Sequence, residues 1–293
     1  MKTSSVRRFL AVGILSGLGV LLGVGTLLGE GTLSGVKDLS GEPPARAQAA
    51  EDTAWFELEG DLAAVWQLTP GQAANTLRIV PRPTSAAEAE LGAEALVVFA
   101  KRSSAYGIAM NRILKVFGRR KIQISWTLSN SEGELSNATR ELRAVERGHY
   151  DLVFAMGSDA TAWLHQRLEG SATPVVSVCS KDPVLMGLIE DYEGGSGSNF
   201  AFTSLNVPVD VQLAYLRTLR PSLSQIALVY TRSNTSTVLT QVDPMVERAE
   251  AEGIEIHRVE VLDQDLAREE LDWKVQRAVY RMRRQDPDGE SSV

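Results

Sequence analysis

The chain has 293 residues, of which 44% are hydrophobic and 23% charged, a balance typical of a globular protein with a sizeable core. Its formal net charge is -7. This acidity argues against general nucleic-acid binding, which needs a basic surface to neutralise phosphates. The single cysteine, Cys179, excludes an intrachain disulfide and a cysteine metal cage.

The N-terminal segment, residues 1–49, has the pattern of an export signal. Three basic residues, the last of them Arg8, precede an uncharged run from Phe9 to Leu28, which is typical of a signal peptide or a membrane anchor. An Ala47-x-Ala49 cleavage pattern follows. Both interpretations place residues 50 onward outside the cytoplasm. We therefore predict a periplasmic or otherwise extracytoplasmic protein, with membrane anchoring through residues 9–28 as an open alternative.

Residues 50–92 form an N-terminal extension to which the sequence assigns no function. Short strands are predicted at 55–59 and 77–80, and an alanine-rich helical turn at 85–91.

From residue 93 the chain alternates strand and helix patterns, which implies right-handed crossovers and mostly parallel sheets. The polar link Glu193–Ser198 divides this region. The prediction is an α/β fold of two Rossmann-like lobes, lobe 1 at 93–204 and lobe 2 at 205–293. With only two strand patterns, lobe 2 is expected to be incomplete at the C-terminus. The predicted strands are 95–100, 121–126, 151–156, 174–179, 225–230 and 254–261.

Small hydroxyl, amide and acidic residues follow several of these strands. In an open parallel sheet, ligands bind outside the carboxyl ends of the strands, and free N–H groups at a helix start favour an anion. The predicted ligand-binding positions are Ser104, Tyr106, Gly157, Ser158, Asp159, Ser180, Asp182, Asn234 and Ser236.

Each of these positions also has a structural interpretation. Ser158, Asp159 and Asn234 could cap the helices that follow them. Asp182, which precedes Pro183, could belong to a simple turn, and Tyr106 could be an ordinary packing residue.

The order of these segments resembles the ABC-transporter substrate-binding proteins of the type I periplasmic-binding fold, closest to the group with tryptophan- and tyrosine-type binders. The resemblance implies two lobes that close on a small organic ligand, amino-acid-like, and an ABC permease as partner. It further implies that Asp159 and Asp182 accept hydrogen bonds from an ammonium group and that Tyr106 stacks on a ring. The segments that carry it are Asp151–Ser158, Pro174–Val178, Asp182-Pro183, Gly187-Leu188, Ser198-Asn199, Val207–Gln212, Leu219–Ile226 and Val229-Tyr230.

No catalytic constellation is visible in the sequence, so we predict no enzyme, no cofactor and no metal. The three histidines, His149, His165 and His257, are scattered, and none has a partner at metal-ligand spacing; the last two are expected at the surface. The alternative function is a membrane-anchored sensor or interaction protein that uses the same fold without transport.

Overall fold

The computed structural model describes residues 55–82, 92–262 and 267–293. The predicted export segment at 1–49 and the helical turn at 85–91 lie outside these ranges. Within the ranges, no helix is both long and apolar enough to cross a membrane. The described chain divides into two compact units: residues 55–156 with 171–175, and residues 157–170 with 176–293. The proposed lobe boundary near residue 204 stays a prediction.

The α/β fold predicted from the alternating pattern is confirmed. Seven strands form one sheet in the order β1-β2-β4-β3-β5-β6-β7, and β8 and β9 form a second. At the centre of the first sheet, β3 (Ala93–Phe99) pairs in parallel with β4 (Ile124–Asn130) and with β5 (Leu152–Met156). Their apolar residues are almost completely buried, as expected for parallel strands covered on both faces.

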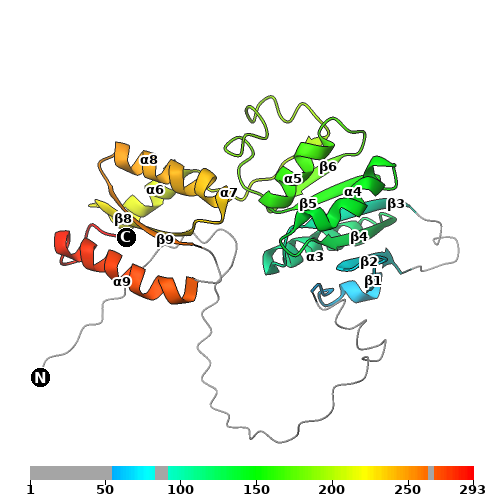
Figure 1. Cartoon of the computed structure of the whole chain (residues 1–293), viewed down its shortest axis with the longest axis horizontal. Helices are drawn as coiled ribbons and strands as arrows, with labels where there is room; N and C mark the ends of the chain where they lie inside the picture. Colours follow the sequence, from blue (N-terminus) through cyan, green and yellow to red (C-terminus); the bar gives the residue numbers. More distant parts are fainter. Residues whose placement is uncertain (1–54, 83–91, 263–266) are drawn as a thin grey trace, which may run out of the picture. The chain divides into compact units, whose positions relative to one another are not determined.

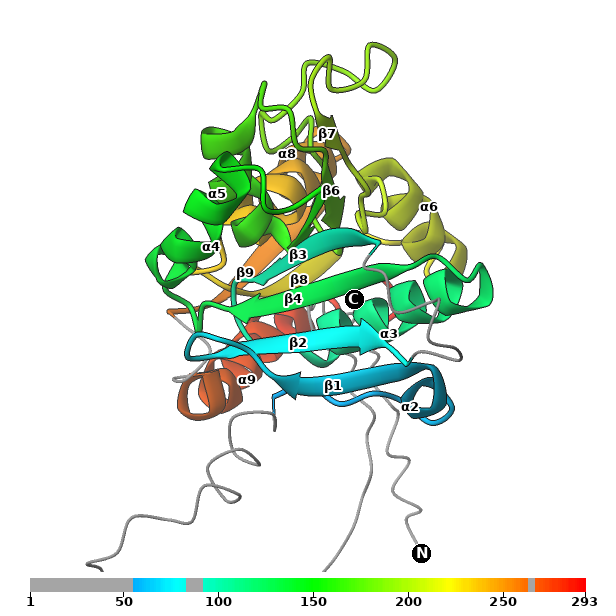
Figure 2. The ribbon, with the colours of Figure 1, turned by 90° about the vertical axis from the view of Figure 1, so that its right-hand side faces the viewer.

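The N-terminal extension adds a hairpin to this sheet. Strands β1 (Trp66–Pro70) and β2 (Thr76–Pro81) are antiparallel, and β2 pairs antiparallel with β4, so that β1, β2, β4 and β3 lie side by side (Figure 2). The strand predicted at 77–80 is confirmed. The one predicted at 55–59 is wrong, because residues 56–59 are irregular and the first strand begins at Trp66.

Helices pack against the first sheet through buried aromatic and aliphatic residues. Trp66 is only 1% exposed, and its Nε1–H donates to the Leu114 carbonyl at 3.2 Å, which fixes the hairpin to α3. The remaining elements up to residue 201 are α2 (Leu62–Val65), α3 (Ser104–Arg119), η2 (Leu135–Ala138), α4 (Thr139–Glu146), α5 (Ser158–Leu168), β6 (Val175–Val178) and β7 (Phe200–Ala201).

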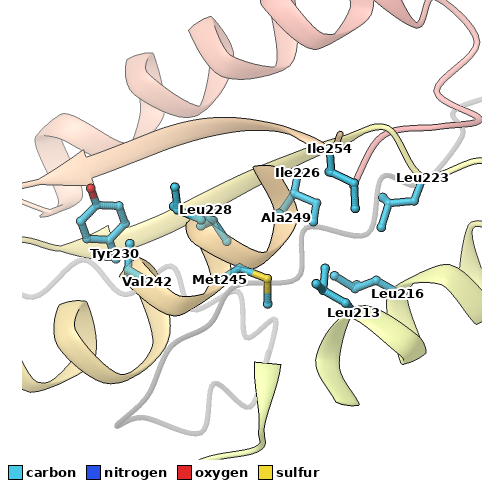
Figure 3. Close-up of a cluster of buried hydrophobic side chains, with 11 residues drawn as sticks. Leu213, Leu216, Leu223, Ile226, Leu228, Tyr230, Val242, Met245, Ala249 and Ile254 are labelled. Carbon is cyan, nitrogen blue, oxygen red and sulfur yellow. The ribbon is translucent and has the colours of Figure 1, made fainter. Parts of the chain in front are cut away.

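The C-terminal region has its own small sheet and core. Helices α6 and α8 lie on one face of the parallel pair β8–β9, and α9 lies on the other (Figure 1). Figure 3 shows the core between α6, α8 and β8, where Leu213, Met245 and Leu228 converge. The elements are α6 (Val209–Leu219), β8 (Gln225–Thr231), α7 (Thr235–Thr237), η3 (Val238–Val242), α8 (Asp243–Ala251), β9 (Glu255–Val261) and α9 (Ala267–Gln285).

The helix predicted after β8 is interrupted by a π-helical turn, η3. Pro244 lies near the start of α8, and a proline cannot donate to the carbonyl four residues earlier. That carbonyl belongs to Thr240, and it accepts instead from the side-chain amides of Gln241 at 3.1 Å and Asn206 at 3.2 Å. The widened turn therefore follows from a proline whose lost hydrogen bond is replaced by side chains.

The last residues of the chain pair with β8 in parallel. Ser292 bridges Gln225, and the Ala227 N–H donates to the Val293 carbonyl at 2.7 Å. Three residues are too few to show a strand period in the sequence, so this pairing was not predicted. His257 lies in the same buried region, with Nε2 2.9 Å from Gln225 Oε1; the expectation that it is a surface residue is wrong.

Candidate functional site

The turn between β5 and α5 is shaped by Gly157. Its φ of 89° and ψ of 168° belong to a region of backbone space that essentially only glycine adopts. The Gly157 N–H donates to the Val178 carbonyl at 2.8 Å, so the ends of β5 and β6 are joined. Ser158 is buried at the first position of α5, and its Oγ accepts from the Lys181 N–H at 3.0 Å. Asp159 follows and is exposed.

The loop after β6 turns sharply at Cys179, whose φ is +55°. Burial raises the pKa of its thiol, which therefore stays protonated at neutral pH. Ser180 is buried and forms a parallel bridge with Ser204. Lys181 is half-buried, and burial lowers its pKa to about 8. A partly desolvated ammonium of this kind attracts an anionic group more strongly than an exposed one.

Asp182 holds the next turn together. Its Oδ1 accepts from the N–H groups of Val184 and Leu185 at 3.0 and 3.1 Å, and its Oδ2 accepts from the Tyr192 hydroxyl. Burial, followed by this hydrogen bond and the Asp182 charge, raises the pKa of Tyr192 to about 12. The carboxylate therefore has the turn role that the sequence left open. A ligand ammonium would have to share it with Tyr192.

A cavity of about 350 Å³ adjoins this turn within the same compact unit. Its lining includes three aromatic rings, those of Tyr192, Phe200 and Phe202. The two phenylalanine rings are stacked 5.7 Å apart, and His165 lies 5.0 Å from Phe200, edge to face. These residues were not predicted as site candidates, although two phenylalanines at a spacing of two indicate one face of an extended segment.

Asn234 caps the short helix after β8. Its Oδ1 accepts from the Thr237 N–H at 3.2 Å and from the Ser236 hydroxyl at 3.1 Å. The Ser236 carbonyl in turn accepts from the Thr240 hydroxyl at 2.7 Å. The capping interpretation thus accounts for Asn234, and the hydroxyl of Ser236 is already used.

Two candidates lie at the end of β3. Ser104 is the exposed first residue of α3, and the Tyr106 ring lies 6.4 Å from the Phe99 ring. Phe99 is in register with Met156, so the loops that follow β3 and β5 begin at the same edge of the sheet. This geometry therefore indicates that Tyr106 packs against Phe99.

Four of the predicted positions, Gly157, Ser158, Ser180 and Asp182, lie in two connected loops. Lys181 lies in the same loops and was not predicted from the sequence. Asn234 pairs with Ser236 in a separate capping group. The contacts that join the first group are the hydrogen bonds of Gly157 to Val178 and of Ser158 to Lys181. Among the described residues, no cluster of three or more His, Cys, Asp or Glu side chains is arranged to hold a metal ion.

Comparison with known proteins gives one family and a set of similar folds. The sequence model of the family described as ABC transporter substrate binding protein matches residues 107–279. No curated protein sequence matches the chain.

Among solved structures, a conserved domain protein from Vibrio cholerae has a TM-score of 0.52 at 16% identity, over 61% of this chain and 60% of that one. Two others are similar at 20% identity. One is an ABC domain in complex with L-Trp from Streptococcus pneumonia, with a TM-score of 0.49 over 60% of this chain and 59% of that one. The other is a ligand-free, open substrate-binding protein with adhesive properties from Clostridium difficile, with a TM-score of 0.47 over 60% of each chain. The chain thus spans about 60% of the length of these structures.

Proposed function

The chain belongs to the ABC transporter substrate-binding protein family, and from this membership we propose that it binds a small organic ligand outside the cytoplasm and delivers it to an ABC permease. The observation that carries the proposal is the family match over residues 107–279, which includes the loops after β5, β6 and β8. The family consists of binding proteins, so no covalent chemistry is part of the proposal. The proposal includes export through the N-terminal segment. Residues 9–28 are either removed after export or retained as a membrane anchor.

The ligand contacts are proposed at the loops that the sequence analysis selected. Backbone N–H groups at the start of α5 would bind a carboxylate, and the half-buried Lys181 would add a positive charge. The aromatic rings of Phe200 and Phe202, which line the cavity together with Pro183, would contribute apolar surface. This combination favours a ligand with an acidic group and an apolar or aromatic body, which an aromatic amino acid has. We propose a ligand-binding cleft between two lobes on the basis of family membership alone.

Thermal unfolding in the presence of amino acids and small carboxylates tests this function. A ligand that binds only the folded state raises the melting temperature by mass action, with about 2.7 kcal/mol of added stability at a ligand concentration 100 times Kd. We expect one or more members of the panel to stabilise the chain. Ser158→Ala should reduce the shift, because it removes the side chain that holds the Lys181 loop against α5.

Asp182→Ala should also reduce the shift, and Asp61→Ala serves as the matched control. Asp61 is an exposed carboxylate in the other compact unit and caps its short helix without a side-chain hydrogen bond. If Ser158→Ala and Asp182→Ala retain the full shift in melting temperature, as the control Asp61→Ala should, the ligand binds elsewhere. A well-folded chain that no member stabilises would contradict the proposed function for this ligand class.

A further inference from the structure

A second cavity, of about 630 Å³, lies entirely within the unit formed by residues 55–156 and 171–175. The β1–β2 turn, the neighbouring part of β2 and β4, and the helix α4 with the residues that follow it form its walls. The turn is held closed by the Gly71 N–H, which donates to the Thr76 carbonyl at 2.8 Å. Its volume lies within the range of small-molecule sites. None of its lining residues is among the ligand positions discussed above.

Glu141 on α4 is the first sign that this cavity takes a polar ligand. It lines the cavity and is only 6% exposed. Within the described ranges it accepts no hydrogen bond and forms no ion pair. The Glu141 carboxylate oxygens are not among the fully buried side-chain atoms that lack a partner in the described residues, so they are accessible from the cavity that Glu141 lines. The cavity therefore contains an acceptor that no described protein group engages.

Arginine side chains line the same cavity. Arg78 already has a partner in the protein, because its guanidinium forms a bidentate ion pair with the Glu94 carboxylate at 2.6 and 2.5 Å. Arg140 and Arg147 are exposed at the cavity wall, and neither forms an ion pair with any residue that the structure describes. Guanidinium groups bind carboxylates through paired hydrogen bonds. The uncommitted charges at the wall are thus two positive groups and one buried negative group.

Tyr150 connects these charges to the sheet. Burial raises the pKa of the Tyr150 phenol. A hydrogen bond with Thr127 lowers this pKa in part, and the charge of Glu141 raises it again. The phenol therefore remains a neutral hydroxyl at physiological pH. The Glu141 charge thus acts on Tyr150, and both residues line the cavity.

We propose that this cavity is a second small-molecule site, which binds an amino acid or a similar zwitterion. The ammonium group donates to Glu141, and the carboxylate pairs with Arg140 and Arg147. This arrangement gives the buried Glu141 the donor that it lacks and uses both uncommitted arginines. A plain anion would leave Glu141 without a donor, and a plain cation would leave the arginines without an acceptor.

A matched pair of probes tests the assignment, L-aspartate and succinate, which share two carboxylates and differ in the ammonium group. Amide NMR spectra of the full chain are titrated with each probe, and the dissociation constant is taken from Ala144 and Tyr150, which line the cavity. L-Aspartate should bind more tightly than succinate. Glu141→Gln should weaken L-aspartate by roughly tenfold or more, which corresponds to the loss of a hydrogen bond to a charged group. It should not weaken succinate, because removing the Glu141 charge relieves its repulsion of the dianion.

Arg147→Ala should weaken both probes, and because Arg147 is exposed this variant is expected to fold even if Glu141→Gln does not. Asp182→Asn, in the other compact unit, should leave both dissociation constants unchanged, which separates this site from the one in the proposed function. Equal binding of the two probes, or no shift at Ala144 and Tyr150 with either one, would overturn the assignment.

Discussion

A buried polar network fixes the C-terminal residues to the small sheet. The Gln225 side chain contacts His257, 2.9 Å away, and Ser292, 3.4 Å away. The Ser292 hydroxyl donates to Asp286 at 2.6 Å. Buried polar groups of this kind are stabilising only when all of them have partners. The last residues of the chain are therefore held by specific hydrogen bonds and not by apolar packing alone.

Asp286 makes the stability of this region depend on pH. Burial raises the pKa of its carboxyl, but the hydrogen bonds from Ser292, Ser291 and Glu290 outweigh burial and hold the pKa below its usual value. The resulting stability is present above the unfolded pKa of about 4 and is lost as the pH falls through the lower folded value.

We therefore expect acid to lower the urea midpoint of the native chain more than that of Asp286→Asn, measured by circular dichroism from about pH 5 downward. Asp288→Asn is the control, because Asp288 is exposed two residues away. Identical acid dependence in Asp286→Asn and the native chain would contradict the role given to these hydrogen bonds.

At the scale of elements, the strands of the parallel sheets were predictable because both of their faces are buried. The run at 151–156 is observed as Leu152–Met156, and that at 225–230 as Gln225–Thr231. The run at 121–126 is observed three to four residues later, as Ile124–Asn130. In its second half the polar residues Ser129 and Asn130 are buried, and Ser129 is in register with Thr76 of β2. A hydrophobic pattern cannot reveal polar residues that become buried through a pairing that was not predicted.

The β1 strand and the η3 turn were not predictable from hydrophobic pattern. Strand β1 has five residues and ends in Pro70, which gives too few positions for a period. Pro244 causes the break at η3, but the side chains that satisfy the freed Thr240 carbonyl, Gln241 and the distant Asn206, are not visible in a hydrophobic pattern. The loop contact of Ser158 with Lys181 likewise joins residues far apart in the sequence.

The core between α6, α8 and β8 gives a prediction about packing. Met245 is only 1% exposed and lies among Leu213, Leu228 and their neighbours (Figure 3). Met245→Ala should lower the free energy of unfolding by about 2–5 kcal/mol, because the cavity that it leaves cannot fully collapse. The control is Leu239→Ala at a 46% exposed position on η3, which should change stability by about 0.5 kcal/mol. Urea unfolding followed by circular dichroism measures both, and equal effects would contradict the packing described.

At the scale of the whole molecule, family membership was predictable and the site details were not. The order of short segments from Asp151 to Tyr230 predicted the family that the comparison gives. The same segments could not show that Asp182 binds Tyr192 or that Asn234 caps its helix. Those partners are brought together by the fold. The ligand positions therefore remain predictions, even though the family is established.

Hydrogen exchange of the full chain, with and without the ligand that stabilises it best, tests directly whether the proposed loops bind the ligand. Ligand binding slows exchange where it orders or covers backbone N–H groups. We predict slower exchange in the loops at 157–159 and 180–182, and at 234–237 after β8. Slower exchange confined to other segments, or no change at a concentration that raises the melting temperature, would contradict the site proposed here.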